Sequence, residues 1–134
     1  MPDDYSTVLR NEFCANEGSF LLQLRVNLTW DKAAFTRLTE AMLACCKAYD
    51  AVDRRAAGIG SGADTTCLPR WIAEGFWYVS WFVKSWTTHP AWAERTKPEQ
   101  EYYDRAYERL FDLAFWFFTG DSPYEHPDKA FASM

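Results

Sequence analysis

The side chains best suited to chemistry in this sequence are its cysteines and histidines, and their spacing argues against a metal or redox site. The cysteines are Cys14, Cys45, Cys46 and Cys67, and no two of them form a Cys-x-x-Cys pair. Cys45 and Cys46 are adjacent, so on a helix their side chains diverge by about 100° and cannot share a tetrahedral ion. His89 and His126 each precede a proline, which places them at the ends of elements. We expect all four cysteines to be reduced, Cys45 and Cys46 to fill the core, and the chain to hold no metal and no cofactor.

The sequence also lacks a recognisable catalytic motif. Gly58, Gly60 and Gly62 resemble part of a phosphate-binding loop, but such loops follow a strand and precede a helix, whereas a predicted helix precedes these glycines. No serine or cysteine stands in a local nucleophile signature. We therefore predict no catalytic residues, and a set assembled from distant positions stays open.

Aromatic residues are the most unusual feature. They make up 18% of the chain, and five of the seven tryptophans fall between positions 71 and 92. On a helical wheel Trp77 and Trp81 fall on the polar side of their predicted helix, among Arg70, Glu74 and Lys84. We predict that these five residues contact a partner, because tryptophan is enriched at the energetic centres of interfaces. The alternative is that the tail after Gly120 covers both rings.

The helices that position these residues follow from hydrophobic periodicity and from end signals. Three long helices are predicted, over Asp31–Val52, Pro69–Thr87 and Pro98–Thr119, with a short helix over Tyr5–Phe13 before them. The fold class is mainly α, a compact helical bundle.

Two pairs of residues support helix starts. Asp31 is a good N-cap, and Trp30 and Phe35 flank it in the positions of a hydrophobic staple. Thr96 and Glu99 have the spacing of a capping box.

The segment 20–28 fits two structures. Apolar residues alternate with mostly polar ones from Phe20 to Leu28, which favours a strand, while its leucines also suit a helix. We favour a strand or extended segment narrowly, although it lacks a second strand to pair with. Residues 56–66 are predicted to form a glycine-rich loop and residues 121–134 an irregular tail.

Length and charge narrow the class of protein. The chain has 134 residues, which suits one domain over 1–134, and a formal net charge of -5, which argues against nucleic-acid binding. No apolar stretch is long enough to span a membrane, and the polar N-terminal segment has no apolar signal core. We expect a cytoplasmic protein that does not associate with membranes.

Three functions remain open. The first is a non-catalytic protein-binding domain, and an acidic inhibitor or immunity-type protein against a basic toxin is one such class. The second is a small-molecule-binding protein, a sensor or enzyme, with an aromatic cavity lined by Trp71, Tyr78 and Tyr107. The third is a homodimer in which the aromatic faces of two chains meet.

Overall fold

The protein is a bundle of helices, as the sequence predicts. A computed structural model describes residues 4–59 and 69–124, and within those ranges it contains helices and no strand. The predicted mainly α fold, with three long helices and a short N-terminal one, is therefore confirmed.

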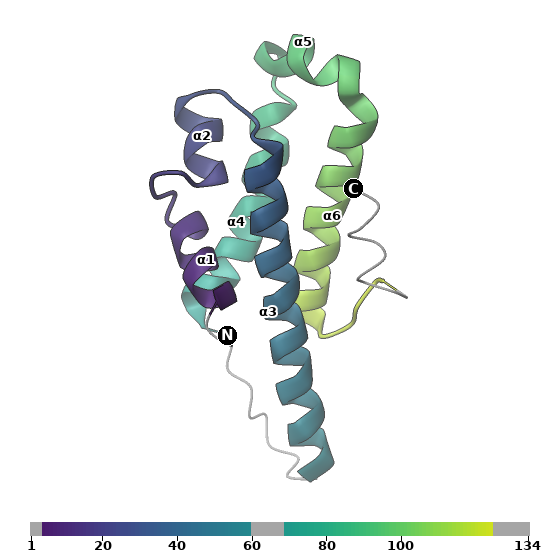
Figure 1. Ribbon diagram of the computed structural model, residues 1–134. Helices are drawn as coiled ribbons and strands as arrows, with labels where there is room; N and C mark the ends of the chain where they lie inside the picture. Colours follow the sequence, from purple (N-terminus) through teal and green to yellow (C-terminus); the bar gives the residue numbers. More distant parts are fainter. Residues whose placement is uncertain (1–3, 60–68, 125–134) are drawn as a thin grey trace.

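The helices surround a common core, and two short ones, placed end to end, take the place of one long helix (Figure 1). These short helices are α1 (Asp4–Phe13) and α2 (Phe20–Val26), and the long ones are α3 (Lys32–Ile59), α4 (Arg70–Thr87) and α6 (Gln100–Thr119). Helix α1 packs on α3 and α4, and α6 packs on the same two helices from the other side. The directions alternate along the chain, so α4 and α6 are antiparallel neighbours.

The start of α3 has the local structure that its sequence predicts. The Asp31 side chain accepts a hydrogen bond from the Ala34 amide at 3.1 Å, which satisfies one of the free amides of the first turn. The rings of Trp30 and Phe35 lie 5.1 Å apart between centroids, as a hydrophobic staple requires. Both predictions about this helix start are confirmed.

The strand or extended segment that we favoured over 20–28 is wrong, because residues 20–26 form helix α2. Ser19 caps the helix by accepting from the Leu22 amide. Phe20, Leu21 and Leu24 are buried with helical spacing. A strand would instead have buried Val26, which is exposed. The caps and the absence of a pairing strand outweigh the alternation of residues.

A buried carboxylate joins α1 to α2. Glu12 is fully buried, and its Oε1 accepts from the Phe20 amide at 2.9 Å. Its Oε2 lies 3.8 Å from the guanidinium of Arg37 on α3. Burial raises the pKa of Glu12, and the Phe20 and Arg37 contacts oppose that rise only in part.

The segment before α6 is also different from its prediction. The chain forms a 3-10 turn (Pro90–Trp92), the short helix α5 (Ala93–Thr96) and a second 3-10 turn (Lys97–Glu99) before α6 begins. Thr96 has helical backbone angles, and its hydroxyl donates to the Trp92 carbonyl. It therefore cannot act as an N-cap, and the predicted capping box with Glu99 is wrong.

Loops and ends agree with the sequence in part. Gly120 ends α6 in the left-handed conformation with φ 79°. Helix α3 continues to Ile59, so residues 56–59 are helical and not part of the predicted loop. Residues 121–124 form no helix. The rest of the predicted loop and tail, at 60–66 and 125–134, lies outside the described residues, as do Cys67 and His126.

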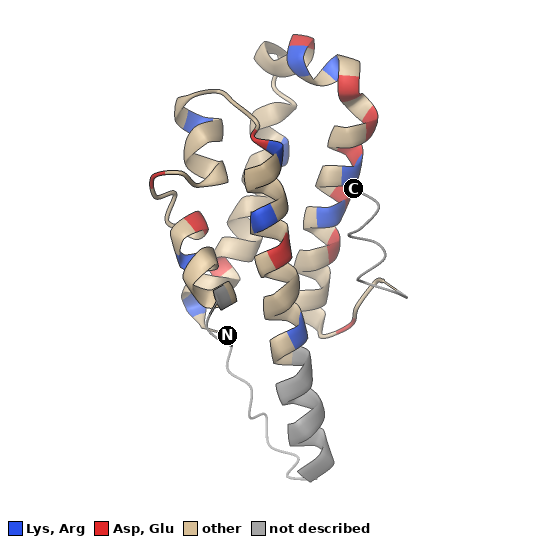
Figure 2. Ribbon diagram, viewed as in Figure 1, with Lys and Arg blue, Asp and Glu red and all other residues tan. Residues whose placement is uncertain are grey.

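Most charged residues of the described helices lie on their outer sides, whereas Glu12 and Arg109 are buried. Acidic and basic positions alternate along the segment that contains α5 and along one side of α6 (Figure 2). Glu101, Asp104, Arg105 and Glu108 are exposed on that side of α6. Between the helices, the core is built from large apolar side chains such as Phe35, Phe76 and Leu110.

Candidate protein-binding surface

The five residues predicted to contact a partner share one exposed side of α4. They are Arg70, Glu74, Trp77, Trp81 and Lys84. Val79, which points in the opposite direction on the helix, is fully buried. The helical wheel therefore places these side chains correctly in the folded chain, while their role in binding stays a prediction.

Trp77 and Trp81 stack on each other at the centre of this side. Their ring centroids are 5.8 Å apart and their planes differ by 4°. Even so, 58% of Trp77 and 53% of Trp81 is exposed. The two rings therefore cover each other in part and leave their outer surfaces open to solvent.

Helix α6 extends the aromatic area. Phe111, Phe115 and Phe118 are each about half exposed, and their spacing of four and three residues keeps them on one side of α6. Trp116, which follows Phe115 in the sequence, is instead buried. The spacing of the phenylalanines from Phe111 to Phe118 is the feature of the sequence that could have identified this exposed set.

The exposed sides of α4 and α6 are adjacent. Lys84 of α4 places its Nζ 5.4 Å from the ring centroid of Phe111. Beneath this contact, Ser80 donates to the Leu110 carbonyl at 3.2 Å, and the rings of Phe76 and Phe117 stack at 4.2 Å. We call the exposed set formed by Trp77, Trp81, Phe111, Phe115 and Phe118 the aromatic surface.

Two opposite charges border the tryptophan pair. Glu74 precedes Trp77 by three residues, and Lys84 follows Trp81 by three residues. Arg70 lies one helical turn before Glu74, but in the part of the chain that the structure describes no salt bridge involves either residue. Both side chains therefore remain available to a partner.

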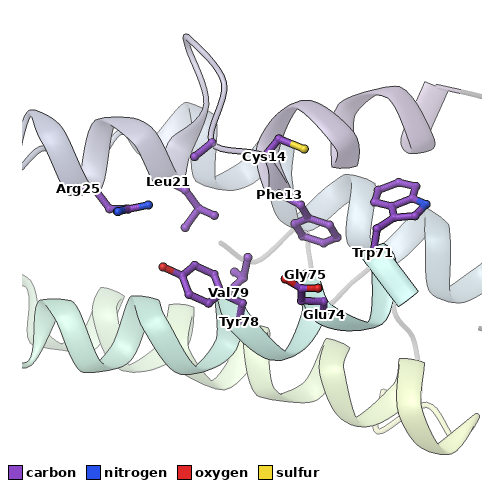
Figure 3. Close-up of a pocket in the computed structure, with 10 residues that line it drawn as sticks. Phe13, Cys14, Leu21, Arg25, Trp71, Glu74, Gly75, Tyr78 and Val79 are labelled. Atoms are coloured by element: carbon purple, nitrogen blue, oxygen red, sulfur yellow. The ribbon is translucent and has the colours of Figure 1, made fainter. Parts of the chain in front are cut away.

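A groove lies on another side of α4, where α1 and α2 approach it. Its volume is about 330 Å³. Arg25 and Tyr78 lie at one end and Trp71 at the other, with Phe13 and Gly75 between them (Figure 3).

Gly75 allows this close approach. A Cβ atom at this position would lie 2.1 Å from Phe13 Cδ2, so any other residue would displace that ring. Trp71 and Tyr78, predicted to line a cavity, do line the groove. Tyr107 does not, because its hydroxyl pairs with Thr87 at 2.6 Å on the α6 side of α4.

The cysteines and the histidine that the structure describes do not gather into one site. Cys45 is fully buried, and burial raises the pKa of its thiol to about 12. Cys46 is buried and donates to the Leu113 carbonyl, whereas Cys14 is exposed beside the groove. His89 accepts from the Ala91 amide and caps the first 3-10 turn. Within residues 4–59 and 69–124 no three potential metal ligands cluster.

A comparison with protein families, curated protein sequences and solved structures finds no match for this chain. Among the described residues, no helix combines the length and the apolar character that crossing a membrane requires.

Proposed function

We propose that this chain is a non-catalytic protein-binding domain that docks its partner through the aromatic surface of α4 and α6. The observation that carries this proposal is that five large aromatic side chains on two neighbouring helices stay about half exposed in the folded chain. Half-buried rings of this kind bury the rest of their area when a partner covers them.

The size of the surface supports the proposal. An aromatic side chain presents roughly 150–250 Å², so five rings exposed by about half present roughly 400–600 Å² of apolar area. The largest apolar patch on a monomeric protein is about 300–600 Å² and is often functional. The aromatic surface is therefore at the upper end of what a soluble chain tolerates without a binding role.

The acidic balance of the chain gives the proposal a finer form, an inhibitor or immunity-type role against a basic protein. The net charge of -5 and the exposed acidic side chains Glu101, Asp104 and Glu108 on α6 support this form. Such a partner would associate rapidly at low salt and more slowly as salt screens the charges. Its association rate should therefore fall steeply with ionic strength.

A site-specific photocrosslinker tests the docking surface. Benzoylphenylalanine replaces Trp81 in one chain and Val26 in a control chain, and both are expressed in cells that naturally make the protein. Val26 is a matched control because it is 67% exposed but lies on α2, outside the aromatic surface. We expect a discrete protein adduct from position 81 that position 26 does not give. Equal adducts from both positions, or none from 81, would contradict the proposal.

The groove supports a second candidate function, the binding of a small apolar molecule. Phe13 packs closely over Gly75 between the two ends of the groove, Trp71 and Tyr78 supply flat apolar surfaces, and Arg25 stands at one end to attract an anionic group. Naphthoate is a suitable probe, since it has a flat ring system and one carboxylate. It should raise the melting temperature of the protein, and Arg25→Ala should reduce that rise. An unchanged melting temperature at saturating naphthoate would count against this candidate.

A further inference from the structure

The positions on the exposed side of α4 are spaced symmetrically about the midpoint between Trp77 and Trp81. They are Arg70, Glu74, Trp77, Trp81, Lys84 and Thr88, spaced by four, three, four, three and four residues. This spacing is that of a coiled-coil seam, in which successive side chains meet a second helix. The tryptophans lie at the centre, and a negative and a positive side chain lie at equal distances on either side of them.

We infer that the partner of the aromatic surface is a second copy of this chain, with the two α4 helices packed antiparallel about a two-fold axis. This inference rests on the proposed function, because it names the partner of the same surface. In this arrangement Trp77 packs on Trp81 of the second copy, and the reverse contact follows by symmetry. The two-fold axis passes between Trp77 and Trp81, at the level of Val79.

Charge complementarity selects the antiparallel direction. The two-fold axis sets Glu74 opposite Lys84 of the second copy, and Lys84 opposite Glu74 of the second copy. Two helices packed in parallel and in register would instead set Glu74 against Glu74 and Lys84 against Lys84. Like charges across an interface disfavour an arrangement, so the same surface that attracts one orientation rejects the other.

The exposed phenylalanines of α6 fit the same axis. Contacts in the core show which residues of α4 and α6 lie level: Ser80 with Leu110, Phe76 with Phe117 and Thr87 with Tyr107. The centre of the tryptophan pair is therefore level with about Leu113, midway between Phe111 and Phe115. Because the axis lies across both helices, it brings α6 against α6 of the second copy.

The same symmetry therefore pairs Phe111 with Phe115 of the second copy. Both halves of the aromatic surface become covered at once, with Phe118 at the margin. Binding to a different protein does not require the aromatic residues of α4 and α6 to be arranged symmetrically about the same axis. The common centre thus favours a second copy over a different protein.

The affinity should be modest. Two aromatic surfaces together contribute roughly 800–1,200 Å², at or below the lower limit of about 1,200–2,000 Å² for stable protein interfaces, before the charged margin is added. We therefore expect a dissociation constant in the micromolar range, with a dimer at high concentration and a monomer at low concentration.

Sedimentation velocity on the purified full chain tests the dimer and its ion pairs. Glu74→Lys and Lys84→Glu should each weaken dimerisation about tenfold or more, because each places like charges at two symmetric contacts. The double variant, with both changes in one chain, should restore it to within about threefold of wild type. Glu17→Lys is the control for Glu74→Lys: it changes the net charge by the same amount at an exposed position between α1 and α2, outside the aromatic surface, and should leave the dimer unchanged. A wild-type chain that stays monomeric up to about 1 mM, or a double variant no better than the single ones, overturns the inference.

Disulfide formation tests the direction of packing. In a chain carrying Cys14→Ser, the pair Glu74→Cys and Lys84→Cys should form a disulfide between two copies under mild oxidation. Glu74→Cys alone should not exceed the parent chain, because antiparallel packing separates the two copies of position 74 by about ten residues, or roughly 15 Å along the helix. A disulfide dimer from Glu74→Cys alone would indicate parallel packing and overturn the proposed arrangement.

The crosslinker at position 81 separates the failure of this inference from the failure of the proposed function. An adduct of twice the chain mass supports the self-association proposed here. A monomeric protein whose position 81 crosslinks to a different protein overturns the inference and leaves the docking surface in place. A monomeric protein with no adduct overturns both.

Discussion

Replacing an exposed tryptophan with alanine should lower the free energy of unfolding much less than replacing a buried one. Trp81 on α4 is 53% exposed, whereas Trp116 on α6 is 4% exposed. Fully burying a large apolar side chain stabilises a protein by about 1.5–3 kcal/mol, so the covered half of Trp81 contributes about 1 kcal/mol. Part of this is regained on substitution, since alanine favours a helix over tryptophan by a few tenths of a kcal/mol.

We therefore expect Trp81→Ala to lower the free energy of unfolding by about 1 kcal/mol or less. Trp116→Ala should lower it by about 3–5 kcal/mol, because it empties a packed site inside the bundle. Both residues lie within long helices, so the backbone context is matched. Trp77→Ala should have an effect of similar size, since either substitution removes the stack between the two rings.

Urea unfolding followed by far-ultraviolet circular dichroism measures both changes. With a denaturant slope of about 2 kcal/mol/M, the midpoint should shift by about 0.5 M or less for Trp81→Ala and by about 1.5–2.5 M for Trp116→Ala. The protein must be dilute enough that the wild-type midpoint does not depend on concentration, so that dimerisation does not contribute. A loss of about 3 kcal/mol or more in Trp81→Ala would refute the reasoning, because it would show that the folded chain itself covers the ring.

Three further predictions concern buried groups. Glu12→Ala should lower the free energy of unfolding by about 1–3 kcal/mol, because the buried Phe20 amide loses its acceptor, while Glu12→Gln keeps an acceptor there. Burial raises the pKa of Glu12 above its usual value of 4.5, so the folded protein holds this proton more tightly than the unfolded chain does. The free energy of unfolding of the wild-type protein should therefore fall as the pH rises from about 4.5 through the raised pKa. Urea unfolding at several pH values measures this fall, and a fall no steeper than that of Glu12→Gln would contradict the prediction. At about pH 8 iodoacetamide should modify exposed Cys14 but not Cys45, whose pKa is raised to about 12; peptide mass spectrometry giving equal rates would contradict the buried placement of Cys45.

Periodicity in the sequence was enough to predict the long helices. Helices α3, α4 and α6 each bury one apolar stripe that repeats every three to four residues, and Asp31 and Gly120 set two of their ends. Helix α2 was missed because seven residues carry too few repeats to distinguish a helix from a strand. Its position depends on Glu12, which is eight residues away from the amide that it binds. No local pattern reports such a contact.

The exposed side of α4 was predictable for the same reason as the helix itself. Once a helix is long and straight, the directions of Trp77 and Trp81 follow from their positions along it. Joining them to Phe111 required the packing of α4 on α6, which the sequence does not specify. The groove required still more, since it arises where Phe13 meets Gly75 across 62 positions of sequence.

We expect the bundle to form without the exposed aromatic residues of α4. Phe76 and Val79 already fill the core beneath α4, while Trp77 and Trp81 stack mainly on each other. An exposed apolar surface favours indiscriminate association unless charges restrict the orientations that can form. In the dimer that we infer, Glu74 and Lys84, placed symmetrically about the tryptophans, supply that restriction. In that dimer, reversing both charges together should preserve the pairing and reversing one should not, which would place the specificity of this surface in the relation between two residues and not in either alone.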